Sequence, residues 1–193
     1  GTILKSVKNP IIEVNLEDNQ SGKTSYVKDV ITAVSNKYHY AKINLVGHSM
    51  GNLQIANYIN ENYNNKKLPQ INKVVSIAGH YDGYLGEEAG QKAKIKNKET
   101  GQPDIYSDGF KKLLPLRKHY PKQIEVLNIY GNKKDGSNSD GSVSVASAQS
   151  YKYLINGRAK SYREVEIKGK NAQHSKLHEN KEVDRLLIDF LWK

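Results

Sequence analysis

Apolar residues occur along the chain with two kinds of spacing, and these predict two kinds of element. Short continuous or alternating apolar runs are typical of β-strands, and they occupy residues 10–16, 43–47, 73–79, 123–131 and 161–169. Apolar residues at i, i+3, i+4 and i+7 form one face of a helix, and this spacing occurs in residues 27–38 and 183–191. Composition predicts a further helix over residues 49–63.

Strands and helices alternate along the chain, as they do in proteins that are built on a parallel sheet. We therefore predict an α/β fold of three layers, in which a mostly parallel sheet is covered by helices on both faces. The run at 161–169 alternates more regularly than the others, which favours a place at the edge of the sheet. With 193 residues and no linker or internal repeat, residues 1–193 are expected to form a single domain.

Residues 80–121 interrupt this alternation with a mostly polar stretch, in which one short helix is expected around residues 110–117. Insertions of this size are commonly lids or substrate loops. This one follows the end of a predicted strand, where such folds bind ligands, so we expect a lid or cap-like insertion. Its candidate contacts with the apolar part of a substrate are Tyr81, Tyr84, Leu85, Tyr106 and Phe110.

The chain has 30 Lys and Arg against 20 Asp and Glu, a formal net charge of +10. Such an excess favours anionic surroundings, but here the basic residues are scattered. Their densest group, from Lys92 to Lys98, lacks the interleaved aromatic residues of a nucleic-acid groove, so we expect no nucleic-acid partner. No apolar run approaches the roughly 20 residues of a transmembrane helix. The lack of cysteine excludes thiol nucleophiles and thiolate metal sites.

The pentapeptide Gly47-His48-Ser49-Met50-Gly51 fits the pattern G-x-S-x-G. It follows a predicted buried strand and precedes a predicted helix, which is the setting of a nucleophile elbow. In such an elbow the strained turn exposes the serine hydroxyl above the sheet, and small glycines let strand and helix approach each other. Ser49 is therefore the expected nucleophile. The alternative is that Ser49 only caps the helix.

A serine hydroxyl is a poor nucleophile unless a base removes its proton, so a histidine is expected after a later strand. The loop after residues 161–169 offers His174 and His178. We favour His174, which lies nearer to the end of the strand, and interpret His178 as a polar residue at the start of the last helix. A metal site on this pair is not expected, because no further ligands cluster nearby.

The histidine in turn needs a carboxylate that accepts its second N–H and stabilises the imidazolium formed during attack. Asp135 and Asp140 both follow the predicted strand at residues 123–131. Asp140 precedes Gly-Ser-Val-Ser and a helix, which resembles the acid segment of many serine hydrolases, so it is the preferred acid. Asp135 lies beside Gly136 and also fits a simple turn.

Three segments that contain these residues resemble the α/β-hydrolase superfamily, and within it the bacterial domain-of-unknown-function 915 group: INLVGHSMGN, VLNIYGNKKDGSNSDGSVSVASAQS and AQHSKLHENKEVDRLLIDFLW. The similarity covers most of the chain from about Asn9 onward. It implies an α/β-hydrolase fold, a triad of Ser49, Asp140 and His174, and an oxyanion hole that uses the backbone N–H of Met50. It also implies hydrolysis of an ester-like bond without a cofactor, at the surface of a bacterial cell or elsewhere outside the cytoplasm.

One part of that family's pattern is missing from the sequence. Family members have, upstream of the elbow, a strand that ends in a His-Gly motif and supplies the second oxyanion donor, and no such motif precedes Pro10. The superfamily's sheet order places this strand between those that resemble residues 10–16 and 43–47. We therefore expect the sequence to be the later part of a longer protein, without the early strands. Direct pairing of residues 10–16 with 43–47 would contradict this expectation.

These observations predict a serine hydrolase, similar to a carboxylesterase or lipase, that acts on a small-molecule or lipid-like ester. The alternative is a non-catalytic binding module on the same fold, held to an anionic partner at the cell surface by its positive charge.

Overall fold

The structure is a computed structural model that describes residues 10–14 and 25–193. The helices are α1 (Ser25–Tyr38), α2 (Met50–Asn62), α3 (Glu88–Lys92), α4 (Asp108–Leu113), α5 (Leu116–His119), α6 (Val145–Gln149), α7 (Tyr151–Ile155) and α8 (Lys181–Trp192). Two short 3₁₀ helices precede α8: η1 (Lys170–Ala172) and η2 (His174–Glu179). The strands are β1 (Lys42–His48), β2 (Gln70–Ile77), β3 (Ile95–Asn97), β4 (Gln102–Pro103), β5 (Glu125–Asn132) and β6 (Ser161–Lys168).

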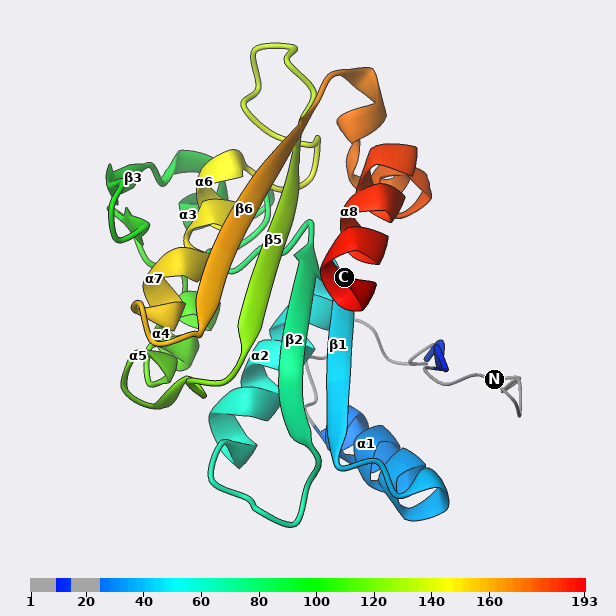
Figure 1. Ribbon diagram of the computed structural model, residues 1–193. Coiled ribbons are helices and arrows are strands. Elements are labelled where there is room, and N and C mark those ends of the chain that lie inside the picture. The colour runs from blue at the N-terminus through cyan, green and yellow to red at the C-terminus, as the bar shows by residue number, and fades with distance from the viewer. Residues whose placement is uncertain (1–9, 15–24) are drawn as a thin grey trace.

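Four strands form the central sheet, in the order β1-β2-β5-β6, and all of them are parallel (Figure 1). In its register Val46 pairs with Val75, and Val75 pairs with Leu127. Since the strands run in one direction, their C-terminal ends meet at one edge of the sheet. The loops after β1, β2, β5 and β6 are therefore neighbours in space, although they are far apart in the sequence.

Helices cover both faces of this sheet, and each face has its own apolar core. Successive strand residues point to opposite faces, so Val74 and Val126 join one core while Val75 and Leu127 join the other. Helices α1, α2, α4, α5 and α7 pack in the first core, and η2 and α8 pack in the second. Figure 1 shows α8 and α2 on opposite sides of the sheet. The architecture is the three-layer α/β arrangement that the sequence predicts.

The predicted strands at 43–47, 73–79, 123–131 and 161–169 are confirmed as β1, β2, β5 and β6, and β6 lies at an edge of the sheet. The predicted helices at 27–38, 49–63 and 183–191 are confirmed as α1, α2 and α8. Helix α8 begins after Asn180, whose side-chain Oδ1 accepts hydrogen bonds from the N–H groups of Glu182 and Val183. This N-cap satisfies two donors that have no partner inside the helix.

The predicted strand at 10–16 is wrong where the structure describes it, because residues 10–14 form no strand. A strand needs a neighbour for its hydrogen bonds, and β1 pairs only with β2 among the described residues. Ile11 and Val14 are instead exposed, at 72% and 44%. Residues 15 and 16 of the predicted strand lie outside the described residues.

The insertion at 80–121 has more regular structure than the sequence predicts. It contains α3, an antiparallel pair of short strands (β3 and β4), α4 and α5. The single helix expected at 110–117 is divided into α4 and α5 around Leu114 and Pro115, since proline has no N–H to continue the helical hydrogen bonds. Phe110, Leu113 and Leu116 are buried, so this half of the insertion belongs to the first core.

Within the described part of the chain, no helix has both the length and the apolar composition to cross a bilayer.

Candidate active site

Ser49 lies in the sharp turn between β1 and α2. Its backbone angles are φ 52° and ψ −122°, a strained conformation for a residue with a side chain. Its N–H donates to the carbonyl of Ile77 at 3.0 Å, which anchors the turn to the neighbouring strand β2. The Ser49 side chain makes no capping hydrogen bond to α2. The hydroxyl is therefore not used as a helix cap and is free to point elsewhere.

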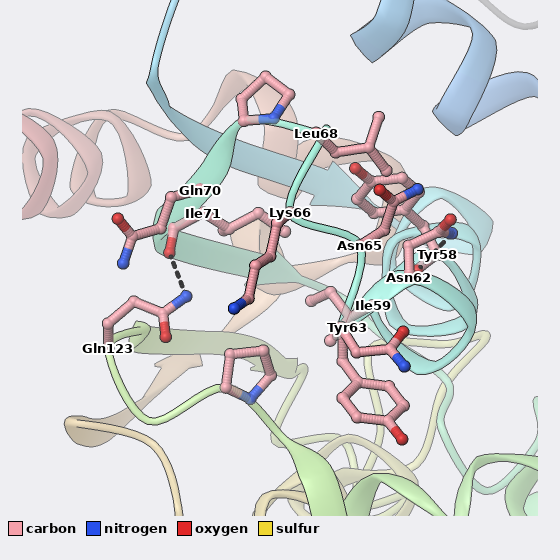
Figure 2. A pocket seen from close by; sticks show the side chains of 13 residues that line it. Tyr58, Ile59, Asn62, Tyr63, Asn65, Lys66, Leu68, Gln70, Ile71 and Gln123 are labelled. Atoms are coloured by element: carbon pink, nitrogen blue, oxygen red, sulfur yellow. Dashed lines mark hydrogen bonds between the residues drawn. The ribbon is translucent and has the colours of Figure 1, made fainter.

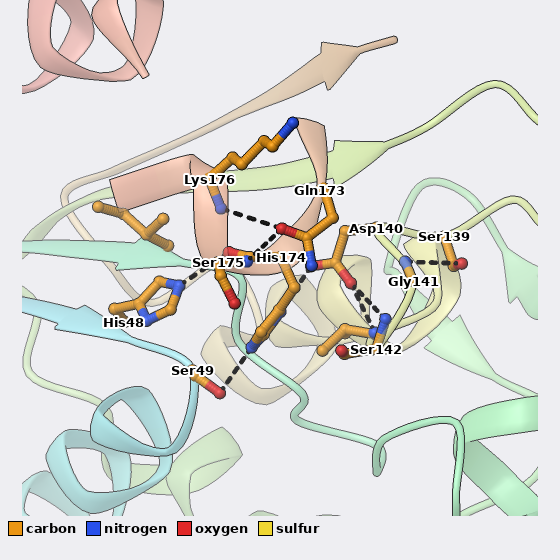
Figure 3. A network of polar contacts seen from close by, with 12 residues as sticks. His48, Ser49, Ser139, Asp140, Gly141, Ser142, Gln173, His174, Ser175 and Lys176 are labelled. Carbon is orange, nitrogen blue, oxygen red and sulfur yellow. Dashed lines mark hydrogen bonds and ion pairs between the residues drawn. The ribbon is translucent and has the colours of Figure 1, made fainter. Parts of the chain in front are cut away.

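The three residues that the sequence singles out come together at the C-terminal edge of the sheet (Figure 3). Ser49 Oγ lies 2.9 Å from His174 Nε2, and His174 Nδ1 lies 2.8 Å from Asp140 Oδ2. Because a carboxylate only accepts, Nδ1 carries the proton and Nε2 is left to accept from the serine hydroxyl. This tautomer is the one in which a histidine can take a proton from serine.

Asp140 is held firmly in this position. Its side chain is 1% exposed, and its second oxygen, Oδ1, accepts hydrogen bonds from the N–H groups of Ser142 and Val143 at 2.9 and 2.7 Å. Its backbone carbonyl accepts from His174 N–H at 3.0 Å. Asp140 thus orients both the ring and the backbone of His174.

The two alternative residues lie outside this network. Asp135 forms an ion pair with Lys133 at 2.9 Å and accepts two hydrogen bonds from Ser137, and these bonds lower the pKa of its carboxyl. The His178 side chain is 50% exposed, and its Nε2 lies 3.7 Å from a Glu179 carboxylate oxygen. The structure therefore brings His174 and Asp140, rather than His178 and Asp135, to Ser49.

Met50 is the first residue of α2, directly after Ser49. The first N–H groups of a helix have no partner within it, and they lie at the positive end of the helix dipole. The backbone N–H of Met50 is one of these first N–H groups, and it directly follows Ser49 in the chain.

Sequence reasoning missed three polar residues around this centre. Asn52 is 2% exposed, and its Nδ2 donates to the carbonyls of Ser49 and Ile77 at 3.0 and 2.8 Å. His48 Nε2 lies 3.1 Å from the carbonyl oxygen of His174. His80 follows β2 and is 7% exposed, and burial lowers its pKa to about 4. The only signal in the sequence was the nearness of His48 and Asn52 to Ser49, because their other partners, His174 and Ile77, are distant in the chain.

The residues expected to contact substrate divide into two groups. Tyr81 and Phe110 are buried in the first core, at 2% and 0% exposure, and Tyr106 packs against Phe110. These three aromatic side chains stabilise the insertion, so their expected contact with substrate is not supported. An aromatic residue in a polar stretch can pack in the core or contact a ligand, and the sequence alone does not distinguish these two roles.

Tyr84 and Leu85 remain candidates for substrate contact. Tyr84 is 51% exposed, and its ring meets that of His80 edge-on at a centroid distance of 6.2 Å. Leu85 N–H donates to the carbonyl of Ser142, in the loop that carries Asp140. Tyr84 thus lies beside His80, and Leu85 lies beside the loop that carries Asp140.

A pocket of about 380 Å³ lies at the other end of the sheet (Figure 2). It is lined by the C-terminal end of α2 around Asn62 and Tyr63, by Gln70 at the start of β2, and by Gln123 before β5. No residue of the Ser49 site lines it. Among the described residues, no group of three or more His, Cys, Asp or Glu is arranged to hold a metal ion.

Comparisons with known proteins agree with the fold. The product of the lin2722 gene of Listeria innocua superposes with a TM-score of 0.88 at 24% identity, over 100% of this chain and 76% of its own. A protein of Lactobacillus plantarum that is described as a candidate cell surface hydrolase superposes with a TM-score of 0.66 at 23% identity, over 87% of this chain and 60% of its own. At these identities the likeness is one of fold alone. No curated protein matched the chain.

A family model described as "Alpha/beta hydrolase of unknown function (DUF915)" matches residues 1–193. The parallel sheet and the helices on both of its faces agree with that description. The chain therefore belongs to the DUF915 family of α/β hydrolases.

Proposed function

We propose that this hydrolase is a serine esterase that uses Ser49 as nucleophile, His174 as general base and acid, and Asp140 as the carboxylate that orients the histidine. The observation that carries the proposal is the continuous chain of hydrogen-bond distances, 2.9 Å from Ser49 to His174 and 2.8 Å from His174 to Asp140. Three distant segments supply these groups, since His174 lies 34 residues after Asp140 and 125 residues after Ser49. A purely structural role for Ser49 would not require such a chain.

In the proposed first half-reaction, Ser49 Oγ attacks the carbonyl carbon of an ester while its proton moves to His174 Nε2. The carbonyl oxygen becomes an oxyanion, which Met50 N–H stabilises. The carbon–oxygen bond of the ester then breaks, His174 returns its proton to the leaving alkoxide, and an alcohol is released. The acyl group remains on Ser49.

In the second half-reaction, His174 removes a proton from water as the water oxygen attacks the acyl carbon. The bond to Ser49 Oγ breaks, Ser49 regains its proton from His174, and a carboxylic acid is released. Throughout the cycle the Asp140 carboxylate accepts from His174 Nδ1–H and stabilises the imidazolium. The reaction needs no cofactor, because the protein supplies the nucleophile, the proton carrier and the oxyanion donor.

The proposed substrate is a small-molecule or lipid-like ester whose apolar part contacts Tyr84 and Leu85. A site of action at the bacterial cell surface is part of the proposal, supported by the description of the Lactobacillus plantarum protein. The net charge of +10 would hold the protein near anionic surfaces.

A serine-directed fluorophosphonate probe tests the nucleophile without knowledge of the substrate. We expect covalent labelling that mass spectrometry assigns to Ser49, that is lost in Ser49→Ala, and that persists in the control Ser35→Ala on α1. Hydrolysis of p-nitrophenyl esters of increasing chain length, beside peptide anilides, then tests the preference for esters. Absence of both labelling and turnover would refute the esterase and favour the non-catalytic binding module for an anionic partner.

A further inference from the structure

His48, the residue before Ser49, makes the contact that links the nucleophile segment directly to the backbone of the base segment. We infer that His48 is a positioning residue: its Nε2–H donates to the carbonyl oxygen of His174 and holds η2 at the correct distance from the elbow. This inference rests on the proposed function of Ser49 and His174. It adds a residue to which neither the family description nor the triad assigns a role.

The position of His48 on β1 brings its ring to η2. Side chains alternate along a strand, so His48 and Val46 point to one face of the sheet and Leu45 points to the other. The His48 face is the one that η2 and α8 cover, where Leu177 of η2 is fully buried. Nε2 of His48 then lies 3.1 Å from the His174 carbonyl oxygen (Figure 3).

The His48 ring also contacts both ends of η2. Its centroid lies 5.1 Å from that of His174 and 5.2 Å from that of His178, which meets it edge-on. A 3₁₀ helix has poorer internal hydrogen bonds than an α-helix, so its placement depends more on contacts with the rest of the protein. The hydrogen bond of His48 to the His174 carbonyl is a directional contact of this kind, and the rings of His174 and His178 pack beside it.

The other hydrogen bonds of the η2 backbone join it to the Asp140 loop and to Gln173, and not to the elbow. His174 N–H donates to the Asp140 carbonyl, and the Gln173 side chain accepts from the N–H groups of Ser175 and Lys176. These bonds place η2 relative to the Asp140 loop and to its own first turn. Among the described residues, His48 supplies the hydrogen bond between the elbow and the backbone of η2, while Ser49 reaches only the His174 side chain.

The chemistry of this contact also fixes the state of His48. A carbonyl oxygen only accepts, so Nε2 must carry a proton. Burial lowers the pKa of His48, which favours the neutral ring. A neutral His48 donates to the carbonyl without placing a positive charge beside the imidazolium that His174 forms during attack.

The test replaces His48 in the full chain by glutamine or by asparagine, whose side-chain amides differ in length. The amide nitrogen of glutamine is as far along its side chain as histidine Nε2, whereas that of asparagine corresponds to Nδ1. We therefore expect His48→Gln to keep the hydrogen bond and His48→Asn to lose it. His178→Gln, which removes one ring contact and no hydrogen bond to the elbow, is the control.

We expect His48→Asn to lower kcat on p-nitrophenyl butyrate by about 10- to 100-fold with KM within about twofold, because misplacement of a catalytic group weakens the chemical step rather than binding. His48→Gln and His178→Gln should stay within about threefold of wild type. A normal kcat in His48→Asn would overturn the inference, and so would an equal loss in His48→Gln.

Amide hydrogen exchange gives a second readout that needs no activity. We expect faster exchange across residues 174–179 in His48→Asn, and exchange like that of the wild type in His48→Gln. Unchanged exchange in both variants would overturn the inference. Failure of the wild type to react with fluorophosphonate would instead refute the proposed esterase and leave the exchange comparison valid for the hydrogen bond.

Discussion

Gly47 and Asn52 approach each other so closely that a Cβ on Gly47 would lie 2.6 Å from Asn52 Oδ1 and 2.9 Å from Asn52 N. The same Asn52 side chain donates to the carbonyls of Ser49 and Ile77, and Ile77 also accepts from Ser49 N–H. The Asn52 side-chain amide thus stabilises the strained turn at Ser49. The lack of a side chain at position 47 leaves room for this amide.

Gly47→Ala should therefore destabilise the elbow. We expect a loss of about 1–3 kcal/mol in the free energy of unfolding, since the added methyl must displace backbone as well as a side chain. Slower labelling of Ser49 should accompany it. Gly51→Ala is the matched control: its added Cβ would have no atom of the described residues within 4 Å, and alanine favours a helix over glycine by up to about 1 kcal/mol. Urea unfolding of both variants measures the contrast, and equal destabilisation would contradict it.

A second prediction separates the two candidate acids. Asp140→Asn should lower kcat by about 10⁴-fold, because an amide at this position no longer stabilises the tautomer and the imidazolium of His174. The amide oxygen can still accept from Ser142 and Val143, so the melting temperature should change little. Asp135→Asn removes an exposed ion pair with Lys133 and should leave kcat within about twofold. Turnover of a p-nitrophenyl ester decides the assignment, and a large loss in Asp135→Asn alone would reverse it.

The sequence contained enough information for the main elements because their patterns are local. The strand at β1, the turn at Ser49 and the helix α2 follow one another, so their order alone indicates an elbow. The segments of Asp140 and His174 could be proposed because each follows a strand of the same parallel sheet. Their order in the chain therefore predicts that they meet at one edge.

The rest depended on contacts that the sequence does not encode locally. Whether Phe110 and Tyr81 face a ligand or the core is decided by α2 and α7, which pack around them. The bond from His48 to His174 spans 126 residues. Residues 10–14 have the composition of a strand, yet no neighbour pairs with them among the described residues. Composition predicts an element only when the fold supplies its partner.

His80 should make the protein less stable in acid. Burial lowers its pKa to about 4 in the folded protein, against 6.5 for an ordinary histidine. Between pH 6.5 and 4, His80 therefore binds a proton in the unfolded chain but not in the folded chain. Stability falls as the pH falls through this range. The full effect is about 3 kcal/mol, from roughly 1.4 kcal/mol per pKa unit.

The variant His80→Gln has no titrating group at this position, so its loss of stability between pH 7 and pH 4.5 should be smaller than that of the wild type. Ser35→Ala on α1, which removes no titrating group, is the control and should keep the wild-type dependence. Urea unfolding at the two pH values measures the difference. An unchanged pH dependence in His80→Gln would show that His80 does not carry the effect.

Asp82 should have the opposite effect over nearly the same range. It is fully buried at the start of the insertion, its Oδ1 accepts from Ser107 N–H at 2.7 Å, and no described residue makes a hydrogen bond to its Oδ2. Burial raises its pKa to about 6, against 3.8 for an ordinary aspartate. Between pH 3.8 and 6 the folded chain holds a proton that the unfolded chain has lost, so stability falls as the pH rises and the cost persists above pH 6.

Asp82→Asn removes this buried charge and keeps an oxygen that can accept from Ser107. We expect it to raise the free energy of unfolding by about 1–3 kcal/mol at pH 7.5, where the wild-type carboxyl is ionised, and to have little effect at pH 4, where it is protonated. Asp108→Asn, at a side chain that is 94% exposed, should change stability little at either pH. Because His80 and Asp82 act in opposite directions, the net loss of stability between pH 7 and pH 4.5 should be larger in Asp82→Asn than in the wild type, where the Asp82 contribution partly offsets that of His80. Equal stability changes for Asp82→Asn at pH 4 and pH 7.5 would contradict this account of the buried carboxyl.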